Sequence, residues 1–224
     1  YTNWIFNQDF LNDYLKLTNT GICDIVEIGL RTLKSSSYLG PFAYTAFDYF
    51  NHCRSYKNIE FSTLINWSDI SNSFEDFINL FPGVDLDFIS IVRIVIKSID
   101  ITEVKKYIML LKDRGYKVCI NIQNCDQLIS VNENYLSEKI SFLNPDIFYL
   151  ADTNGCLNPI QTKLLIEKIS LLTDIPIGVH LHNNQGLAYA NALQAIDSGA
   201  SFIDSTLTGI GRDAGNTQTE FLSY

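Results

Sequence analysis

The stretch Ile177-Gly178-Val179-His180-Leu181-His182-Asn183-Asn184-Gln185-Gly186 decides how the rest of the chain is interpreted. It begins with β-branched residues and ends in a polar turn closed by glycine, which predicts a strand that runs into a loop. Because alternate strand side chains share a face, His180 and His182 are expected to point the same way. Two neutral imidazoles at this spacing suit one divalent cation, although a hydrogen-bonded histidine pair at a sheet end produces the same pattern.

The composition limits the class of protein. The 224 residues are 46% hydrophobic and carry a formal net charge of −9, with no basic cluster, which argues against a nucleic-acid or anionic-membrane partner. No apolar run reaches the length of a membrane span. The odd number of cysteines, without a C-x-x-C pair, predicts free thiols and a cytoplasmic location; they are Cys23, Cys53, Cys119, Cys125 and Cys156.

Apolar periodicity predicts an alternation of strands and helices. Strands are expected at 24–29, 60–65, 88–96, 117–122, 147–151, 177–181 and 201–204, and helices at 8–19, 42–54, 74–80, 101–114, 133–142, 159–172, 187–198 and from 217 onward. This rhythm is typical of βα units on a parallel sheet, either an open doubly wound sheet or a barrel. No G-x-G-x-x-G follows an early strand, so the dinucleotide-binding open sheet has no support.

Polar residues at the ends of the expected strands favour the barrel, because its strand ends converge on one mouth. The predicted fold is therefore a single (β/α)8 TIM barrel over 1–224. Only seven strands can be counted, and a helix precedes them. We therefore expect the first strand to lie upstream of Tyr1, which makes the barrel N-terminally incomplete.

Four segments carry a family resemblance. Residues 178–186 resemble the seventh-strand signature of the metal-dependent aldolase and HMG-CoA lyase-like barrels, which include the pyruvate carboxyltransferase domain. Residues 25–29 (IVEIG), 151–155 (ADTNG) and 209–220 (GIGRDAGNTQTE) are similar to the second-strand, sixth-strand and eighth-strand motifs. Among the family, 4-hydroxy-2-oxovalerate aldolase is the member that the chain resembles most.

The resemblance implies a divalent metal, Mn²⁺ or Mg²⁺, held by His180, His182 and Asn216. It also implies an aspartate ligand and an arginine at the end of the first strand, neither of which is present in this sequence. It further implies catalytic roles for Glu27 and Asp152, although Asp152 also suits the capping of the following turn.

The implied activity is cleavage of a 4-hydroxy-2-oxo acid to pyruvate and an aldehyde through a metal-stabilised enolate. Thr153 and Arg212 are expected to bind the small 2-oxo acid substrate. The sequence leaves open a homo-oligomer. Two alternatives also remain: an acyl-CoA Claisen-type lyase or synthase, related to HMG-CoA lyase or isopropylmalate synthase, and a non-catalytic degenerate barrel.

Overall fold

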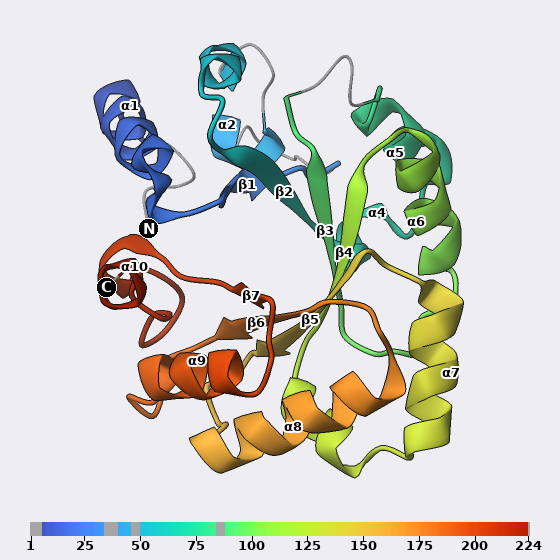
Figure 1. Cartoon of the computed structure of the whole chain (residues 1–224). Coiled ribbons are helices and arrows are strands. Elements are labelled where there is room, and N and C mark those ends of the chain that lie inside the picture. Colours follow the sequence, from blue (N-terminus) through green and yellow to red (C-terminus); the bar gives the residue numbers. More distant parts are fainter. Residues whose placement is uncertain (1–5, 34–39, 46–49, 84–87, 224) are drawn as a thin grey trace. The chain divides into compact units, whose positions relative to one another are not determined.

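The computed structural model describes residues 6–33, 40–45, 50–83 and 88–223. Its seven strands lie in the sheet in the same order as in the sequence (Figure 1). The first strand pairs in parallel with the second, the second with the third, and the fourth to the seventh each with the next. The strands are β1 (Ile25–Leu30), β2 (Glu60–Asn66), β3 (Ile91–Ile96), β4 (Lys117–Ile122), β5 (Ile147–Asp152), β6 (Ile177–Leu181) and β7 (Phe202–Ile203). Helical segments alternate with the strands, as the predicted (β/α)8 class requires.

Most helices match the expected ones with shifts at their ends, but the short helix Trp67–Ile70 has no counterpart among them. The helices are α1 (Gln8–Leu17), α2 (Pro41–Tyr44), α4 (Trp67–Ile70), α5 (Phe74–Leu80), α6 (Val104–Asp113), α7 (Glu133–Leu143), α8 (Pro159–Leu172), α9 (Ala188–Asp197) and α10 (Thr219–Leu222). Shorter helical turns occupy η1 (Thr18–Ile22), η2 (Asn51–Ser55), η4 (Cys125–Ser130) and η5 (Leu207–Gly209). The prediction of one helix over 42–54 was wrong, because Thr45 adopts a left-handed conformation that ends α2, and 46–49 lie outside the described residues.

The chain divides into two compact units, which are described separately. The first comprises Tyr1–Val95 with Glu103–Val118, and the second comprises Ile96–Thr102 with Cys119–Tyr224. The expectation of one domain over 1–224 stays a prediction. No helix in the described part of the chain has the length and apolar character of a membrane span.

Aromatic side chains form much of the core of the first unit. The buried Tyr107 ring on α6 lies edge-on to Trp67 at 4.9 Å and to Phe74 at 4.8 Å between ring centroids. Its hydroxyl donates to the backbone oxygen of Ile70 at 3.2 Å, so the polar end of this ring is satisfied. These contacts hold α4, α5 and α6 together.

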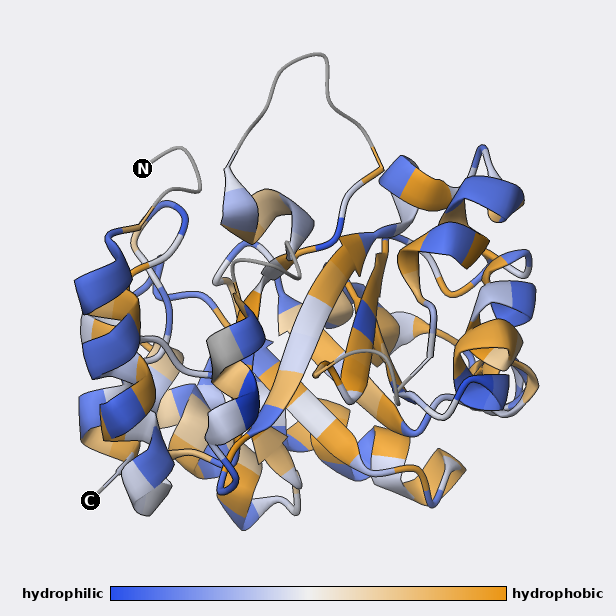
Figure 2. Ribbon diagram, turned by 90° about the horizontal axis from the view of Figure 1, so that it is seen from above, coloured by the Kyte–Doolittle hydropathy of each residue, from blue (hydrophilic) through white to orange (hydrophobic). Residues whose placement is uncertain are grey.

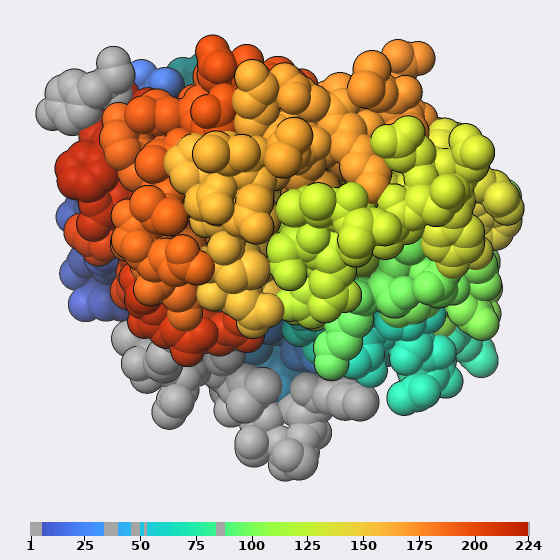
Figure 3. Space-filling model, turned by 90° about the horizontal axis from the view of Figure 1, so that it is seen from below, coloured from blue at the N-terminus to red at the C-terminus, as the bar shows by residue number. Residues whose placement is uncertain are grey.

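Aliphatic packing dominates the second unit. All six residues of β5 are buried, and Figure 2 shows that apolar residues are frequent in the strands while the helices carry both apolar and hydrophilic positions. A capping box of Asn158 and Gln161, with Pro159 at the first turn, starts α8. Helices α8 and α9 pack against each other and form a continuous orange surface in Figure 3.

Strand register sets which side chains of the second unit share a face. Tyr149 pairs with Gly178, and Gly178 pairs with Phe202. Two residues further along, Ala151 pairs with His180. Because side chains alternate along a strand, the face that carries His180 is also the face of Ala151, and the next residue of β5 points to the opposite side.

Candidate metal site

The two histidines at the end of β6 converge on one point. The Nε2 atoms of His180 and His182 are 3.3 Å apart. Two nitrogen ligands that each lie about 2.1 Å from one cation, at roughly a right angle, are about 3 Å apart. The observed separation therefore fits binding of a single divalent ion by both rings.

The two histidines differ at their other ring nitrogen, Nδ1. His180 Nδ1 lies 2.9 Å from Asp204 Oδ2, which belongs to the residue directly after β7. His182 Nδ1 is buried and has no hydrogen-bond partner. Burial, with the neighbouring charges of His180 and Arg212, lowers the pKa of His182. His182 therefore stays neutral near pH 7, as a metal ligand must.

Asn216 reaches the histidines from the glycine-rich loop. An isolated antiparallel bridge joins Asn216 to His182, and the backbone N–H of Asn216 donates to Gly209 O at 3.0 Å. A Cβ on Gly211 would lie 2.7 Å from Asn216 Nδ2, so this glycine leaves the space that the amide occupies. Asn216 Oδ1 is buried and has no hydrogen-bond partner. A buried amide oxygen without a donor is a suitable cation ligand.

These donors fit a divalent cation. The set consists of two neutral imidazole nitrogens and one unpaired amide oxygen, a mixture that suits Mn²⁺ as well as other first-row ions. Among the described residues, no group of three or more His, Cys, Asp or Glu side chains is placed to hold a metal. In the part of the chain that the structure describes, no carboxylate or thiolate therefore joins the two histidines as a further ligand.

Arg212 and Thr153 connect two loops of the second unit. Arg212 Nη2 donates to the backbone oxygen of Thr153 at 2.9 Å, and its Nε lies 3.4 Å from Asp213. The Thr153 hydroxyl accepts the backbone N–H of Asn124 at 3.0 Å. The Arg212 side chain is 56% exposed, so part of its guanidinium faces solvent. The structure thus brings together two residues that were predicted to bind substrate.

The contacts of Asp152 bear on its two expected roles, catalysis and capping of the following turn. Asp152 is fully buried, and it follows Ala151, so its side chain lies on the face of β5 opposite to that of His180. One carboxylate oxygen accepts the backbone N–H of Cys156 at 2.9 Å, and the other accepts that of Leu157 at 3.1 Å. The structure therefore shows the turn-capping role, and a direct catalytic role for Asp152 stays a prediction.

Glu27 lies in the first unit and has a partner that the sequence did not identify. Its carboxylate forms an ion pair with Arg93 of β3 at 3.1 Å, and the Arg93 side chain is only 8% exposed. A buried arginine without its carboxylate would be strongly destabilising, so the pair explains why Glu27 occurs in an apolar strand.

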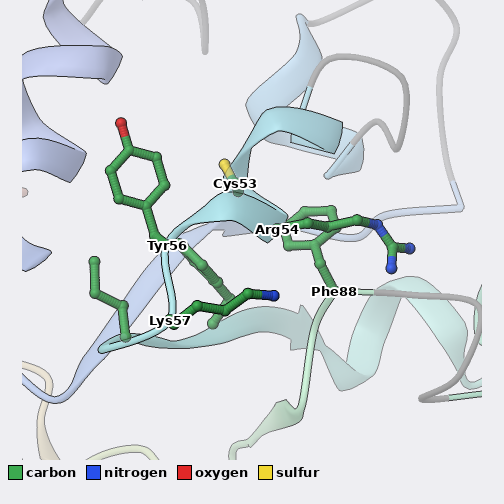
Figure 4. Close-up of a pocket in the computed structure, with 7 residues that line it drawn as sticks. Cys53, Arg54, Tyr56, Lys57 and Phe88 are labelled. Atoms are coloured by element: carbon green, nitrogen blue, oxygen red, sulfur yellow. The ribbon is translucent and has the colours of Figure 1, made fainter.

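One cavity of about 270 Å³ lies in the first unit, and its lining residues fall between positions 53 and 88 of the sequence (Figure 4). It is lined by Cys53, Arg54, Tyr56, Lys57, Ile59, Phe61 and Phe88. Figure 4 shows Arg54 and Lys57 extending to one side while the Tyr56 ring points the other way. None of the residues predicted for the site lines this cavity.

The HMGL-like family model matches residues 96–224, which is more than half of the chain and includes both histidines and the glycine-rich loop. The chain belongs to the HMGL-like family. The resemblance drawn from the four sequence motifs is thereby confirmed.

The matches between this chain and its curated relatives cover only part of each relative. The 4-hydroxy-2-oxovalerate aldolase of Carboxydothermus hydrogenoformans is 44% identical over 77 residues, which are 34% of this chain and 23% of that protein. The oxaloacetate decarboxylase of Mycobacterium tuberculosis is 29% identical over 201 residues, which are 88% of this chain and 57% of that protein. The chain thus spans between about a quarter and just over half of these curated relatives.

Solved structures confirm the barrel class. The N-terminal domain of an aldolase candidate from Bacteroides vulgatus has a TM-score of 0.85 and 29% identity, and the match covers 99% of this chain and 73% of that one. HMG-CoA lyase of Bacillus subtilis has a TM-score of 0.69 at 19% identity, with 98% and 78% covered. The latter likeness shows the fold alone.

Sequence reasoning missed one residue that contacts the candidate site. Asp204 is the last residue of the strand expected at 201–204 and was given no role, yet its carboxylate contacts His180. Its position at the end of the last expected strand was the available signal. The pairing of β7 with β6, which cannot be read from the sequence, was needed to place Asp204 next to His180.

Proposed function

We propose that the chain carries the metal centre of a divalent-metal-dependent lyase that cleaves 4-hydroxy-2-oxo acids to pyruvate and an aldehyde. The observation that carries the proposal is the convergence of the two Nε2 atoms, which are 3.3 Å apart. The backbone of His182 also pairs with that of Asn216, whose Oδ1 is buried without a hydrogen-bond partner. The partial matches to 4-hydroxy-2-oxovalerate aldolases support the choice of reaction.

In this proposal His180, His182 and Asn216 hold Mn²⁺ or Mg²⁺. Such an ion supplies Lewis-acid chemistry: it draws electron density from the 2-oxo group and so favours cleavage of the bond between C3 and C4. The low pKa of His182 keeps that ring available as a ligand. In the proposal, the exposed Arg212 guanidinium binds a substrate carboxylate; its contacts with Thr153 and Asp213 support this role. Glu27 and Asp152 keep their catalytic assignment as predictions.

A second candidate reaction is decarboxylation of oxaloacetate. The relative with this name matches 88% of the chain, more than the aldolase match that covers 34%. Both reactions break the bond between C3 and C4 of a 2-oxo acid and leave pyruvate, so the same metal centre serves either. An acyl-CoA substrate rests on a structural likeness at 19% identity, which gives no support beyond the fold. The cytoplasmic location and a homo-oligomer stay predictions.

The test measures pyruvate release by the protein as its host produces it, loaded with Mn²⁺ and coupled to lactate dehydrogenase. We expect release from 4-hydroxy-2-oxopentanoate, complete loss with EDTA, and at least a 100-fold drop in His180→Ala or His182→Ala. Release from oxaloacetate alone would select the second candidate. Activity that is unchanged in both histidine variants would contradict the metal centre, and the absence of release from either acid would favour the degenerate barrel.

A further inference from the structure

We propose that Asp204 is a positioning residue for His180: it holds the ring so that Nδ1 carries the proton and the Nε2 lone pair faces the site shared with His182. This inference rests on the metal centre proposed above. It assigns a role to a residue outside the set of cation ligands.

Strand pairing brings the carboxylate to the ring. Phe202 and Ile203 of β7 pair with Gly178 and Val179 of β6. The backbone N–H of Asp204 continues this pairing and donates to Val179 O at 2.9 Å. Asp204 therefore lies beside His180 on the same face, and its position is fixed by backbone hydrogen bonds as well as by its side chain.

The contact between the two side chains is short and shielded. Asp204 Oδ2 lies 2.9 Å from His180 Nδ1, and the side chains are 18% and 28% exposed. A carboxylate can only accept a hydrogen bond, so Nδ1 must donate. With its proton on Nδ1, a neutral His180 presents a free lone pair at Nε2, which is the atom 3.3 Å from His182 Nε2.

The second histidine lacks an equivalent support. His182 Nδ1 is buried without a hydrogen-bond partner in the structure. Metal-binding histidines almost always donate their other N–H to a carboxylate, carbonyl or water, and loss of that partner typically weakens metal binding by roughly 10- to 100-fold. Asp204 therefore orients His180 alone, and His182 depends on its backbone bridge to Asn216.

A first experiment reads the proton position without any metal. Nitrogen-15 NMR of the imidazoles is practical because the chain has only three histidines, and His180→Ala identifies the signal. We expect His180 to carry its proton on Nδ1 in the wild type, a mixture of forms in Asp204→Asn, and protonation mainly at Nε2 in Asp204→Ala. The same proton position in all three proteins would overturn the inference.

A second experiment measures Mn²⁺ affinity by electron paramagnetic resonance. We expect the dissociation constant to rise roughly 10- to 100-fold in Asp204→Ala and less in Asp204→Asn, which keeps an acceptor oxygen. The control is Asp197→Asn, an exposed position at the end of α9, with no expected change. Thermal unfolding of each variant excludes a loss of fold as the cause.

The two experiments separate failure of the inference from failure of the proposed function. If the wild type binds Mn²⁺ and His180→Ala does not, but both Asp204 variants bind as tightly as the wild type, the positioning role is wrong and the metal centre stands. If the wild type and His180→Ala bind Mn²⁺ equally, the metal centre is wrong. The proton position in the metal-free protein then still decides whether Asp204 holds the ring.

Discussion

At the scale of single residues, neighbours decide what each polar side chain can do. Asp204 and Asp152 both follow or end a strand in the second unit, yet one contacts His180 and the other caps a turn. The difference arises from strand alternation, since Asp152 is one position beyond Ala151, the register partner of His180. The role of a carboxylate at a strand end can therefore be assigned only when it is known to which face of the sheet its side chain points.

The environment of Asp152 gives a prediction for Cys156. Burial, and then the carboxylates of Asp152 and Asp126, raise the pKa of Cys156 to about 11, from an ordinary value of 9.0. Only the thiolate reacts with iodoacetamide, so at pH 8 we expect alkylation of Cys156 to be roughly 100-fold slower than that of a thiol with an ordinary pKa. Peptide mass spectrometry over time measures the rate at this cysteine separately.

A pair of variants isolates the carboxylate. Asp152→Asn keeps an oxygen for the turn but removes the charge, so alkylation of Cys156 should accelerate. Asp174→Asn, an exposed change in the same unit, should leave the rate as in the wild type. Rapid alkylation of Cys156 in the wild type would show that its pKa is not raised.

At the scale of elements, α8 anchors the loop that follows β4. The Lys168 ammonium donates to three backbone oxygens at the end of η4 and beyond, those of Leu128 at 3.0 Å, Ile129 at 2.9 Å and Val131 at 2.6 Å. At the other end of this loop, Asn124 is bonded to Thr153. Lys168 therefore stabilises the loop whose first residue contacts the predicted substrate-binding threonine.

Replacement of Lys168 should lower the free energy of unfolding. Lys168→Met keeps most of the aliphatic stem and removes three charge-assisted hydrogen bonds, so we expect the free energy of unfolding to fall by about 2–3 kcal/mol. On the same helix, Lys163 forms an exposed pair with Glu167 at 3.7 Å, and Lys163→Met should change it by less than about 0.5 kcal/mol. Urea unfolding compares the two, and equal effects would refute the anchoring role.

Helices and strands with strong local sequence signals were predicted best. Long periodic helices such as α8 were placed correctly, because their boundaries carry caps and prolines. The expected strand 201–204 shortens to two residues. Its two polar end residues, Ser201 and Asp204, each donate one backbone hydrogen bond to β6 but lie outside β7. The break after Tyr44 depends on the left-handed backbone of Thr45, and threonine gives no sequence signal for that conformation.

At the scale of the whole molecule, the barrel class followed from the repetition of βα units and the family resemblance. The histidine pair was predicted because alternation along one strand is enough to place both rings on one face. The partners of those rings were less predictable. Asp204 and Asn216 reach the histidines through pairing between strands and through a folded glycine loop, and these contacts join distant parts of the sequence.

The division into two units had no counterpart in the composition, since no linker or charge block marks it. The curated relatives are longer than this chain, so the substrate and the partners of the whole protein rest on the proposals above. The central claim concerns the second unit alone: His180, His182 and Asn216 form one cation site.

The most direct test of this claim is a crystal structure of the protein grown with Mn²⁺, with data collected at the manganese absorption edge. The account predicts an anomalous difference peak about 2.1 Å from both His180 Nε2 and His182 Nε2, with Asn216 Oδ1 directed at it. A map without a peak between the two rings, at Mn²⁺ concentrations that label other sites, would contradict the account.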